Sequence, residues 1–399
     1  MQPMKEFSFS LIPITEGAAH IEIPDVSQYR VVTELPVFYN ALMEMNRDIA
    51  VLVLNIYQEQ LEKPLSILLP LEATGVRGIR LQLEVPNVQK LIMNDVSSEA
   101  YALMQKNVDL NQLSDYIEVQ NDDALNVMNA YAKRGQRFDI IDVDPFGSPT
   151  RFLDAAIRAL RMDSGLICLT ATDMAPLCGV KPEACLRKYG GRPLRTEYCH
   201  ELAVRLCLNA LITTAARYEI AIEPILCYSI DHYIRIYACL HSGSHKTDST
   251  LQQLGYIVHC FNCNFRISTG NLLAFPPNCP NCNAQLDYSG PLWLGQFADT
   301  TFCEKMLAMA PQLHLKTEKR IMKLLQQILE EVPGPITYHS IHHICHQYKL
   351  NSVSITKVLQ ELQNQGEFAS RTHFSQVSIR TSASRSQIAN VIQQLNTQT

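Results

Sequence analysis

The segment Asp144-Pro145-Phe146 has the residue types best suited to chemistry. It follows a stretch rich in β-branched residues, 140–143, which predicts a buried strand, and Pro145 lacks the N–H that the strand would need to continue. A carboxylate, a backbone carbonyl and an aromatic face therefore stand at the carboxyl end of a strand, where open α/β sheets bind ligands. Asp144 and the Pro145 carbonyl can accept hydrogen bonds from an exocyclic nucleobase amine while Phe146 stacks on the ring. The segment indicates an amine-alkylating enzyme; the alternative is a strand end followed by a simple turn.

Three other predicted strand ends indicate a nucleotide cofactor at the same edge. Gly75 and Gly78 follow the first strand and let the backbone come close to a ligand, although the full Gly-x-Gly-x-x-Gly pattern is not there. Asp95 ends the second strand, where a ribose diol would be bound. Asp122 and Asp123 follow the third, where an acidic side chain can accept from an adenine amine. This set fits an adenosine-containing cofactor, and the Asp-Pro-Phe segment favours S-adenosylmethionine over a hydride carrier.

Two cysteine pairs form a metal-binding pattern. Cys260 and Cys263 are separated by two residues, fifteen residues follow, and Cys279 and Cys282 repeat the spacing. This pattern predicts tetrahedral zinc held by four thiolates, a closed structural site. The remaining cysteines are expected in the core, among them Cys199, Cys207 and Cys227.

The elements that carry these residues predict an α/β fold. Strands alternate with helices and end in a two-strand segment, which indicates a doubly wound sheet with an antiparallel member. The expected strands lie within 65–71, 91–95, 116–120, 138–143, 164–173, 219–230 and 232–241. A hairpin over 7–24 precedes them, and helical spacing continues from Leu42 to Ile56. Arg47 stands out among these apolar residues, because an unpaired buried guanidinium is costly.

The sequence divides into three expected parts. Residues 1–245 would form the sheet domain with its hairpin, 246–316 a zinc-ribbon region after a polar linker over 241–250, and 317–399 a winged-helix-like unit. The last part has expected helices at 318–332, 338–348 and 352–365, then a short hairpin and a frayed helix. Four histidines have helical spacing that could suggest a second metal site, but we expect them to be solvated or to face RNA: His339, His342, His343 and His346.

Composition limits the class of protein. The chain has 399 residues, of which 47% are hydrophobic and 18% charged, and its net charge is −5. No apolar run is long enough for a membrane span and no export signal is visible, and thirteen cysteines fit a reducing compartment, so we expect a cytoplasmic protein. The acidic total argues weakly against nucleic-acid binding, but a local basic stripe would suffice. Such a stripe, or a solvated face, is Lys181, Arg187, Lys188, Arg192 and Arg195.

Motifs spread in order over nearly the whole chain resemble the tRNA guanine-26 N2-dimethyltransferase family. The resemblance is carried by Glu16-Gly17, Phe38-Tyr39-Asn40, Asn46-Arg47-Asp48, the segment 73–80, Asp144 to Pro149, the segment 172–179, Tyr189-Gly190-Gly191, the segment 231–235 and the segment 370–374. It implies a Rossmann-like class I methyltransferase fold and S-adenosylmethionine-dependent methylation of the N2 amine of guanine 26 in tRNA.

The resemblance also implies roles for individual residues. The expected cofactor contacts are Arg47, Arg77, Asp95, Asp123 and Ala124, with Asp122 an open alternative to Asp123. Phe38, Asp144, Pro145 and Phe146 would surround the reacting methyl group and base. No protein partner is implied, and action on guanine 27 stays open, as does a non-catalytic zinc-ribbon and winged-helix protein that binds nucleic acid.

A basic edge near the C-terminus is the expected site for tRNA phosphates, together with the zinc region. It consists of Arg371, His373, Arg380 and Arg385. A base in a paired stem must be turned out of its stack to be methylated, so wide contact with folded RNA is expected.

Overall fold

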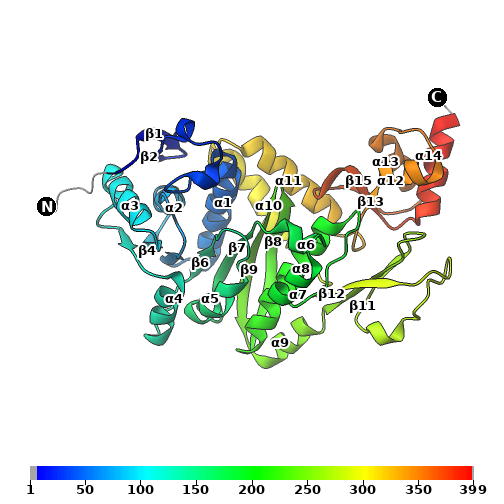
Figure 1. The fold of residues 1–399 in the computed structure, drawn as a ribbon, viewed down its shortest axis with the longest axis horizontal. Helices are drawn as coiled ribbons and strands as arrows, with labels where there is room; N and C mark the ends of the chain where they lie inside the picture. The colour runs from blue at the N-terminus through cyan, green and yellow to red at the C-terminus, as the bar shows by residue number, and fades with distance from the viewer. Residues whose placement is uncertain (1–6, 398–399) are drawn as a thin grey trace.

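A seven-stranded sheet runs through the middle of the protein, in the order β5-β4-β3-β6-β7-β9-β8 (Figure 1). The structure, a computed structural model, describes residues 7–397. The strands are β3 (Leu65–Leu69), β4 (Val88–Asn94), β5 (Ile117–Gln120), β6 (Ile140–Val143), β7 (Leu166–Ala171), β8 (Ile220–Ile230) and β9 (Tyr233–Ser242). β3 to β7 are parallel, and β9 pairs antiparallel with both β7 and β8. The predicted doubly wound sheet with an antiparallel member is confirmed.

The strand order reverses at β3, which pairs with β4 on one side and with β6 on the other. The chain builds outward from β3 through β4 to β5, then returns to add β6 and β7. In such sheets the connections on the two sides of the reversal leave in opposite directions and open a crevice at the carboxyl ends of the strands. The ends of β3 and β6 flank that crevice.

Helices surround the sheet and come from the segments between strands (Figure 1). They are α1 (Glu44–Leu61), α2 (Val76–Glu84), α3 (Ser98–Leu110), α4 (Ala124–Lys133), α5 (Leu153–Ala159), α6 (Met174–Leu177), α7 (Pro182–Tyr189) and α8 (Cys199–Ala216). Helical spacing in the sequence begins at Leu42, whereas α1 begins at Glu44 after a short 3-10 turn, η3 (Ala41–Met43). The predicted N-terminal hairpin is β1 (Leu11–Glu16) with β2 (Ala19–Pro24).

A smaller antiparallel sheet, β11-β10-β12, follows the main sheet. Its strands are β10 (Leu254–His259), β11 (Arg266–Thr269) and β12 (Asp287–Trp293). The polar linker predicted before it is wrong in part, because Ser244–Leu251 form helix α9. Thr247 and Thr250 of that helix are buried, so the low apolar content of the segment concealed a packed face.

The helices of the C-terminal part pack into two different hydrophobic cores. α10 (Thr300–Met309) and α11 (Glu318–Glu331) pack on α1 and share the apolar core of the main sheet. A second core joins α12 (Ile341–Tyr348), α13 (Ile355–Asn364) and α14 (Arg385–Thr397) to the sheet β13-β15-β14. Those strands are β13 (His339–Ser340), β14 (Ala369–Thr372) and β15 (Ser375–Thr381). Three helices beside a small antiparallel sheet form a winged-helix-like unit as predicted, but from a different set of helices. The helix expected first, 318–332, is α11 and packs in the main core, whereas α14, expected to be frayed, completes the unit.

Among residues 7–397, no helix combines the length and the apolar character needed to cross a lipid bilayer.

Candidate active site at the ends of β3 and β6

The Asp144 loop leaves the end of β6 and is fixed by its neighbour β7. Gly147 N donates to Thr172 Oγ1 at 2.8 Å, and Thr172 N donates to the Gly147 carbonyl at 2.9 Å. Gly147 has φ +80°, a conformation that a residue with a side chain rarely adopts. Pro145 is buried, whereas Phe146 is 72% exposed and meets the ring of Phe38 edge-on at 4.8 Å. The loop thus presents an open aromatic face beside a half-buried carboxylate.

Arg77 connects this carboxylate to the sheet. Its Nη2 donates to Asp144 Oδ2 and, at 2.8 Å, to Asn46 Oδ1. Its Nη1 lies 3.3 Å from Asp142 Oδ2. Arg77 is 5% exposed, so its charge depends on these carboxylates for stabilisation. The predicted residues Arg77 and Asp144 are therefore in direct contact.

A second buried guanidinium, that of Arg235 on β9, binds the same carboxylate as Arg77, that of Asp142. It donates two hydrogen bonds to the Asp142 carboxylate, at 2.8 and 2.6 Å. Burial alone would raise the pKa of Asp142, but the guanidiniums of Arg235 and Arg77 outweigh burial and lower it. Asp142 is thus an anion that positions Arg77, which in turn positions Asp144.

The glycines of the first turn act mainly on packing. Gly75 has φ +82° and stands immediately before α2, so Arg77 enters in the first turn of that helix. A Cβ at Gly78 would come within 2.3 Å of Met93 Sδ. Gly78 therefore lets α2 lie close to β4, which differs from the predicted approach of backbone to a ligand.

Asp95 and Asp123 stand after β4 and β5, as the sequence predicts, and both organise the turns there. Asp95 accepts from Ala73 N at 3.0 Å and from Ser97 N at 2.9 Å. Asp123 is the N-cap of α4, immediately before Ala124, and accepts from Leu125 N at 2.7 Å. Its carboxylate is 44% exposed, which leaves it open to a ligand.

Arg47 is held by the N-terminal hairpin. Its Nε and Nη2 donate to the two oxygens of Glu16, at 2.5 and 2.6 Å, and Tyr39 Oη donates to Glu16 at 2.9 Å. Burial would raise the pKa of Glu16, but Arg47 and Arg80 outweigh it and lower the pKa. Arg47 thus has the partner that its buried position requires. Its neighbour Asn46 is the residue of α1 that bonds to Arg77.

Glu72, which the sequence did not single out, is a further ionisable group of this cluster. It follows β3, is 7% exposed, and accepts from Gly78 N at 2.8 Å. Burial raises its pKa to about 8 against the opposing effect of Arg77, and the nearby Asp142 and Asp144 add to the rise. A buried carboxyl group whose pKa is strongly shifted beside specific charged partners is frequent at functional sites. The sequence feature that could have identified Glu72 is its position after a predicted strand and shortly before Gly75.

Three buried donors in the cluster make no hydrogen bond within the described residues: Asn46 Nδ2, Arg77 Nη1 and Arg235 Nε, although Arg77 Nη1 lies 3.3 Å from Asp142 Oδ2 in an ion pair. Unpaired buried donors are costly, so they favour a ligand that brings acceptors such as a carboxylate. The exposed carboxylate of Asp123 suits the opposite chemistry, donors such as an amine. The donor and acceptor set therefore fits an amino-acid-bearing nucleoside such as S-adenosylmethionine.

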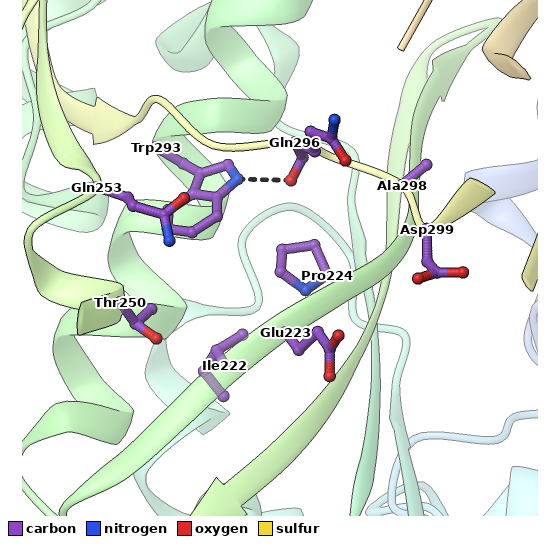
Figure 2. Close-up of a pocket in the computed structure, with 9 residues that line it drawn as sticks. All are labelled: Ile222, Glu223, Pro224, Thr250, Gln253, Trp293, Gln296, Ala298 and Asp299. Atoms are coloured by element: carbon purple, nitrogen blue, oxygen red, sulfur yellow. Dashed lines mark hydrogen bonds between the residues drawn. The ribbon is translucent and has the colours of Figure 1, made fainter. Parts of the chain in front are cut away.

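A separate pocket of about 360 Å³ lies where β8 meets α9 and the segment after β12 (Figure 2). Two of its polar groups take part in the fold: Trp293 Nε1 donates to the Gln296 carbonyl at 2.7 Å (Figure 2), and Asp299 accepts from Phe302 N at 2.6 Å. Another pocket, of about 380 Å³, lies beside the β1–β2 turn and is lined by Glu44, Arg80 and Lys316, among others. Neither pocket is lined by a residue of the predicted active site.

The four cysteines of the small sheet converge. Cys260 Sγ lies 3.5 Å from Cys282 Sγ, Cys263 Sγ lies 3.5 Å from Cys279 Sγ, and all four sulfur atoms are within 4.8 Å of one another. Thiolates around tetrahedral zinc are about 3.8 Å apart, given a Zn–S bond of about 2.3 Å. The two halves also share a backbone turn, since Asn264 and Asn283, each directly after the second cysteine of its pair, both have φ 60°. The predicted ligand set can therefore close around one zinc ion.

The predicted basic edge near the C-terminus is largely wrong. Arg380 is 1% exposed and donates to Glu201 and Glu331, and His373 is buried against Glu331. Arg385 is 8% exposed and donates to Glu197 at 2.9 Å. The sequence shows these positive charges but not the distant carboxylates that pair with them. Only Arg371 of the set is both half-exposed and without a carboxylate within salt-bridge distance in the described part of the chain.

The other polar predictions have mixed outcomes. The first histidine of the spaced set, His339, is buried, which is contrary to expectation, whereas His342, His343 and His346 are exposed. Within residues 7–397 these four form no cluster that could hold a metal ion. Lys181, Arg187, Lys188 and Arg195 are exposed around α7. Cys207 and Cys227 are buried as predicted, but Cys199 is only half-buried, so its assignment to the core is wrong.

Comparisons with known proteins agree over nearly the whole chain. Residues 17–393 match the family model described as "N2,N2-dimethylguanosine tRNA methyltransferase". A tRNA (guanine(26)-N(2))-dimethyltransferase of Methanosphaera stadtmanae is 39% identical over 369 residues, which cover 92% of this chain and 93% of that protein. A relative in Aquifex aeolicus, named for action on guanine 26 and guanine 27, is 34% identical and covers 96% of each chain.

A solved structure has the same fold along almost its entire length. It is Trm1 from Pyrococcus horikoshii in complex with S-adenosyl-L-methionine, with a TM-score of 0.83 and 38% sequence identity. The match covers 96% of this chain and 100% of the other. The similarity thus includes the main sheet, the cysteine-bearing sheet and the C-terminal unit.

Proposed function

The chain belongs to the N2,N2-dimethylguanosine tRNA methyltransferase family, and from that premise we propose that it transfers methyl groups from S-adenosylmethionine to the exocyclic N2 of guanine 26 in tRNA. The observation that carries the proposal is the contact of Arg77 with Asp144 at the end of β6, beside the exposed ring of Phe146. The contact fixes an acceptor next to a stacking surface, which is what recognition of a guanine amine requires.

Asp144 and Pro145 draw on the N–H bonds of the amine. Arg77 occupies Oδ2 of Asp144, and Oδ1 makes no hydrogen bond to the described part of the chain. That oxygen can accept from N2, as can the Pro145 carbonyl, while Phe146 and Phe38 enclose the base. The bound sulfonium supplies an electrophilic methyl group. N2 would gain that methyl as the S–CH3 bond breaks and the sulfur becomes a neutral thioether, and the amine would release a proton to solvent. Asp144 would stabilise the positive charge that develops on the amine.

The cofactor would be bound along the carboxyl edge of the sheet. Asn46 Nδ2, which makes no hydrogen bond within the described residues, and the neighbouring Arg77 guanidinium support binding of its amino-acid carboxylate. Asp95 would accept from the ribose, and Asp123 with Ala124 would contact the adenine. Arg47, held by Glu16, would place the start of α1 at this site. Asp123 is favoured over Asp122 because Asp122 Oδ1 already accepts from Asp123 N and Asn126.

The parts outside the main sheet would serve the RNA. We assign methyl transfer to residues 1–245, a structural zinc ribbon to 246–316 and tRNA binding to 317–399. The convergence of Cys260, Cys263, Cys279 and Cys282 supports a zinc ion that stabilises a small sheet with little core of its own. Exposed basic residues around α7 and Arg371 are candidates for phosphate contacts.

A defined tRNA transcript incubated with the protein and S-adenosylmethionine tests the proposal, with nucleosides read by mass spectrometry. We expect N2-methylguanosine and then N2,N2-dimethylguanosine, and loss of both when guanine 26 is replaced by adenine. A second transcript in which guanine 27 is replaced separates action at the two positions. Methylation of a ring nitrogen, or of no nucleoside, would overturn the proposal.

A further inference from the structure

Two thiols from separate segments meet outside the active site. Cys178 is the C-cap of α6 and Cys199 is the first residue of α8. Their Sγ atoms lie within 4.8 Å of each other, and a ring nitrogen of His200 is within the same distance of both. Both cysteines are half-buried residues, in contrast to the fully buried Cys185 and Cys207.

The surroundings favour a thiolate at Cys199. The nearby Cys178 thiol lowers the pKa of Cys199 against the effect of burial, and Arg195 adds to the lowering. The positive end of α8, an 18-residue helix, acts in the same direction. The pKa of Cys178 is raised, mainly by the nearby Cys199 and by burial, so Cys178 keeps the proton. Arg195 and the positive end of α8 also oppose binding of a metal cation between Cys178, Cys199 and His200.

We propose that Cys178 and Cys199 form a reversible disulfide when the protein meets a low-molecular-weight disulfide such as glutathione disulfide. The Cys199 thiolate attacks one sulfur of that molecule, the S–S bond breaks, and a glutathione thiolate leaves with the electron pair. Cys178 passes its proton to the solvent or to that thiolate and attacks Cys199 in the mixed disulfide, releasing the second glutathione. The protein loses two electrons and the glutathione disulfide gains them.

The new bond would act on the loop that carries Asp144. To form an S–S bond of about 2.05 Å, the two sulfur atoms must come closer together, and any part of the gap that side-chain rotation does not close draws the two segments together. Cys178 ends the short segment that starts at Thr172. Thr172 makes two hydrogen bonds with Gly147 of the Asp144 loop, one through its backbone N–H and one through its side-chain hydroxyl. In the same segment, Asp173 accepts from Lys188 Nζ at 2.9 Å and from Tyr189 Oη. Movement of Cys178 toward α8 therefore strains the contacts that fix Gly147.

Oxidation should consequently slow methyl transfer, an effect that rests on the proposed function. The disulfide itself does not rest on it, because it is detected by mass. The two can thus fail separately: a protein that forms the bond but never methylates tRNA would count against the proposed function alone.

The full-length, zinc-loaded protein is first reduced, then incubated with glutathione disulfide and mapped by mass spectrometry without reductant. We expect a linked peptide pair containing Cys178 and Cys199, reversed by dithiothreitol together with any loss of turnover. In Cys178→Ser, glutathione should instead remain attached to Cys199, because the second thiol is missing.

Two controls keep the test independent of folding defects. Cys239 is also half-buried, but burial raises the pKa of its thiol to about 12, so it should stay reduced, and Cys239→Ser should form the disulfide as the parent protein does. In the unmodified protein, iodoacetamide should label Cys199 faster than Cys239. The inference is overturned if both thiols persist under glutathione disulfide, if Cys239 reacts first, or if metal analysis gives a second zinc per chain that Cys178→Ser removes.

Discussion

Arg77 donates a hydrogen bond from Nη2 to Oδ2 of Asp144, which joins the first turn of α2 to the end of β6 across the reversal in strand order. The carboxylate proposed to meet the substrate amine is therefore held from one side and open on the other. Arg77 also contacts Asp142, which forms a buried ion pair with Arg235. Charged side chains in contact with one another thus extend from Asp144 to β9.

Replacing Asp144 should separate catalysis from cofactor binding. Asp144→Ala removes the acceptor for the amine, and we expect kcat to fall by at least about 10²-fold, the usual size of losing one preorganised electrostatic contact in the transition state. Cofactor affinity, measured by calorimetry, should change little. Asp144→Asn retains one oxygen acceptor and should keep more activity than Asp144→Ala. A variant with near-full turnover would remove Asp144 from the mechanism.

Glu72 should make folding stability depend on pH. Its pKa is about 8 in the folded protein and near the ordinary 4.5 when unfolded. Folding therefore takes up a proton between these values: the stability contributed by neutral Glu72 is complete below the lower value and is lost as the pH rises through the upper one.

In Glu72→Gln this dependence disappears. Each pKa unit corresponds to about 1.4 kcal/mol. Between about pH 5 and about pH 9 the unfolding free energy of the parent protein should therefore fall by a few kcal/mol more than that of the variant. Urea unfolding at the two pH values measures the change. The exposed Glu118→Gln is the matched control and should follow the parent. Parallel curves for Glu72→Gln would show that this carboxyl titrates normally.

Phe146→Ala should weaken productive binding of tRNA. Base–aromatic stacking contributes about 1–3 kcal/mol per base, so kcat/KM for tRNA should fall by about 5- to 150-fold. Cofactor affinity should stay the same, because the ring is 72% exposed and packs only against Phe38 among the aromatic residues described. Leu273→Ala, at a 95% exposed residue of the cysteine-bearing sheet region, controls for the loss of a surface apolar group. Equal effects of the two substitutions would argue against stacking on Phe146.

Cys260→Ser should remove the zinc ion and loosen the small sheet. One zinc per chain is expected in the parent by elemental analysis, and none in the variant, with faster proteolysis between β10 and β12. Cys303→Ser, at a buried cysteine of α10, should retain the metal. Absence of zinc from the parent protein, together with unchanged stability of Cys260→Ser, would refute the assignment.

Arg380 and Arg371 should behave differently although both are arginines of the C-terminal sheet. Arg380→Met leaves the buried carboxylates of Glu201 and Glu331 with less compensation, and we expect a loss of about 3–5 kcal/mol in unfolding free energy. Arg371→Met should leave stability nearly unchanged and lower the affinity for tRNA, with a weaker dependence on salt. Filter binding over a salt series and denaturant unfolding measure the two effects. The reverse pattern would restore the basic edge predicted from the sequence.

The sequence predicts features that depend on neighbouring residues. The strand that ends at Asp144, the carboxylates after β4 and β5, and the cysteine spacing are all local patterns, and each lies where it was expected. Charge partners are different because they come from distant segments: Glu16 pairs with Arg47 and Glu331 with Arg380. An arginine reads the same in the sequence whether it is exposed or buried, so these pairings, and the burial of Glu72, required the structure.

One buried carboxylate has a wider consequence. Glu197, just before α8, accepts from Arg266 of the small sheet at 3.1 Å and from Arg385 of the C-terminal unit at 2.9 Å. The small sheet, whose Leu292 and Trp293 belong to the core of the main sheet, and the C-terminal unit, which has its own core, are therefore anchored to one carboxylate beside α8. A transfer RNA docked on the outer regions would meet the reaction centre at a fixed distance from its docking site. The protein would therefore select its nucleotide by that distance and not by the sequence of the neighbouring bases.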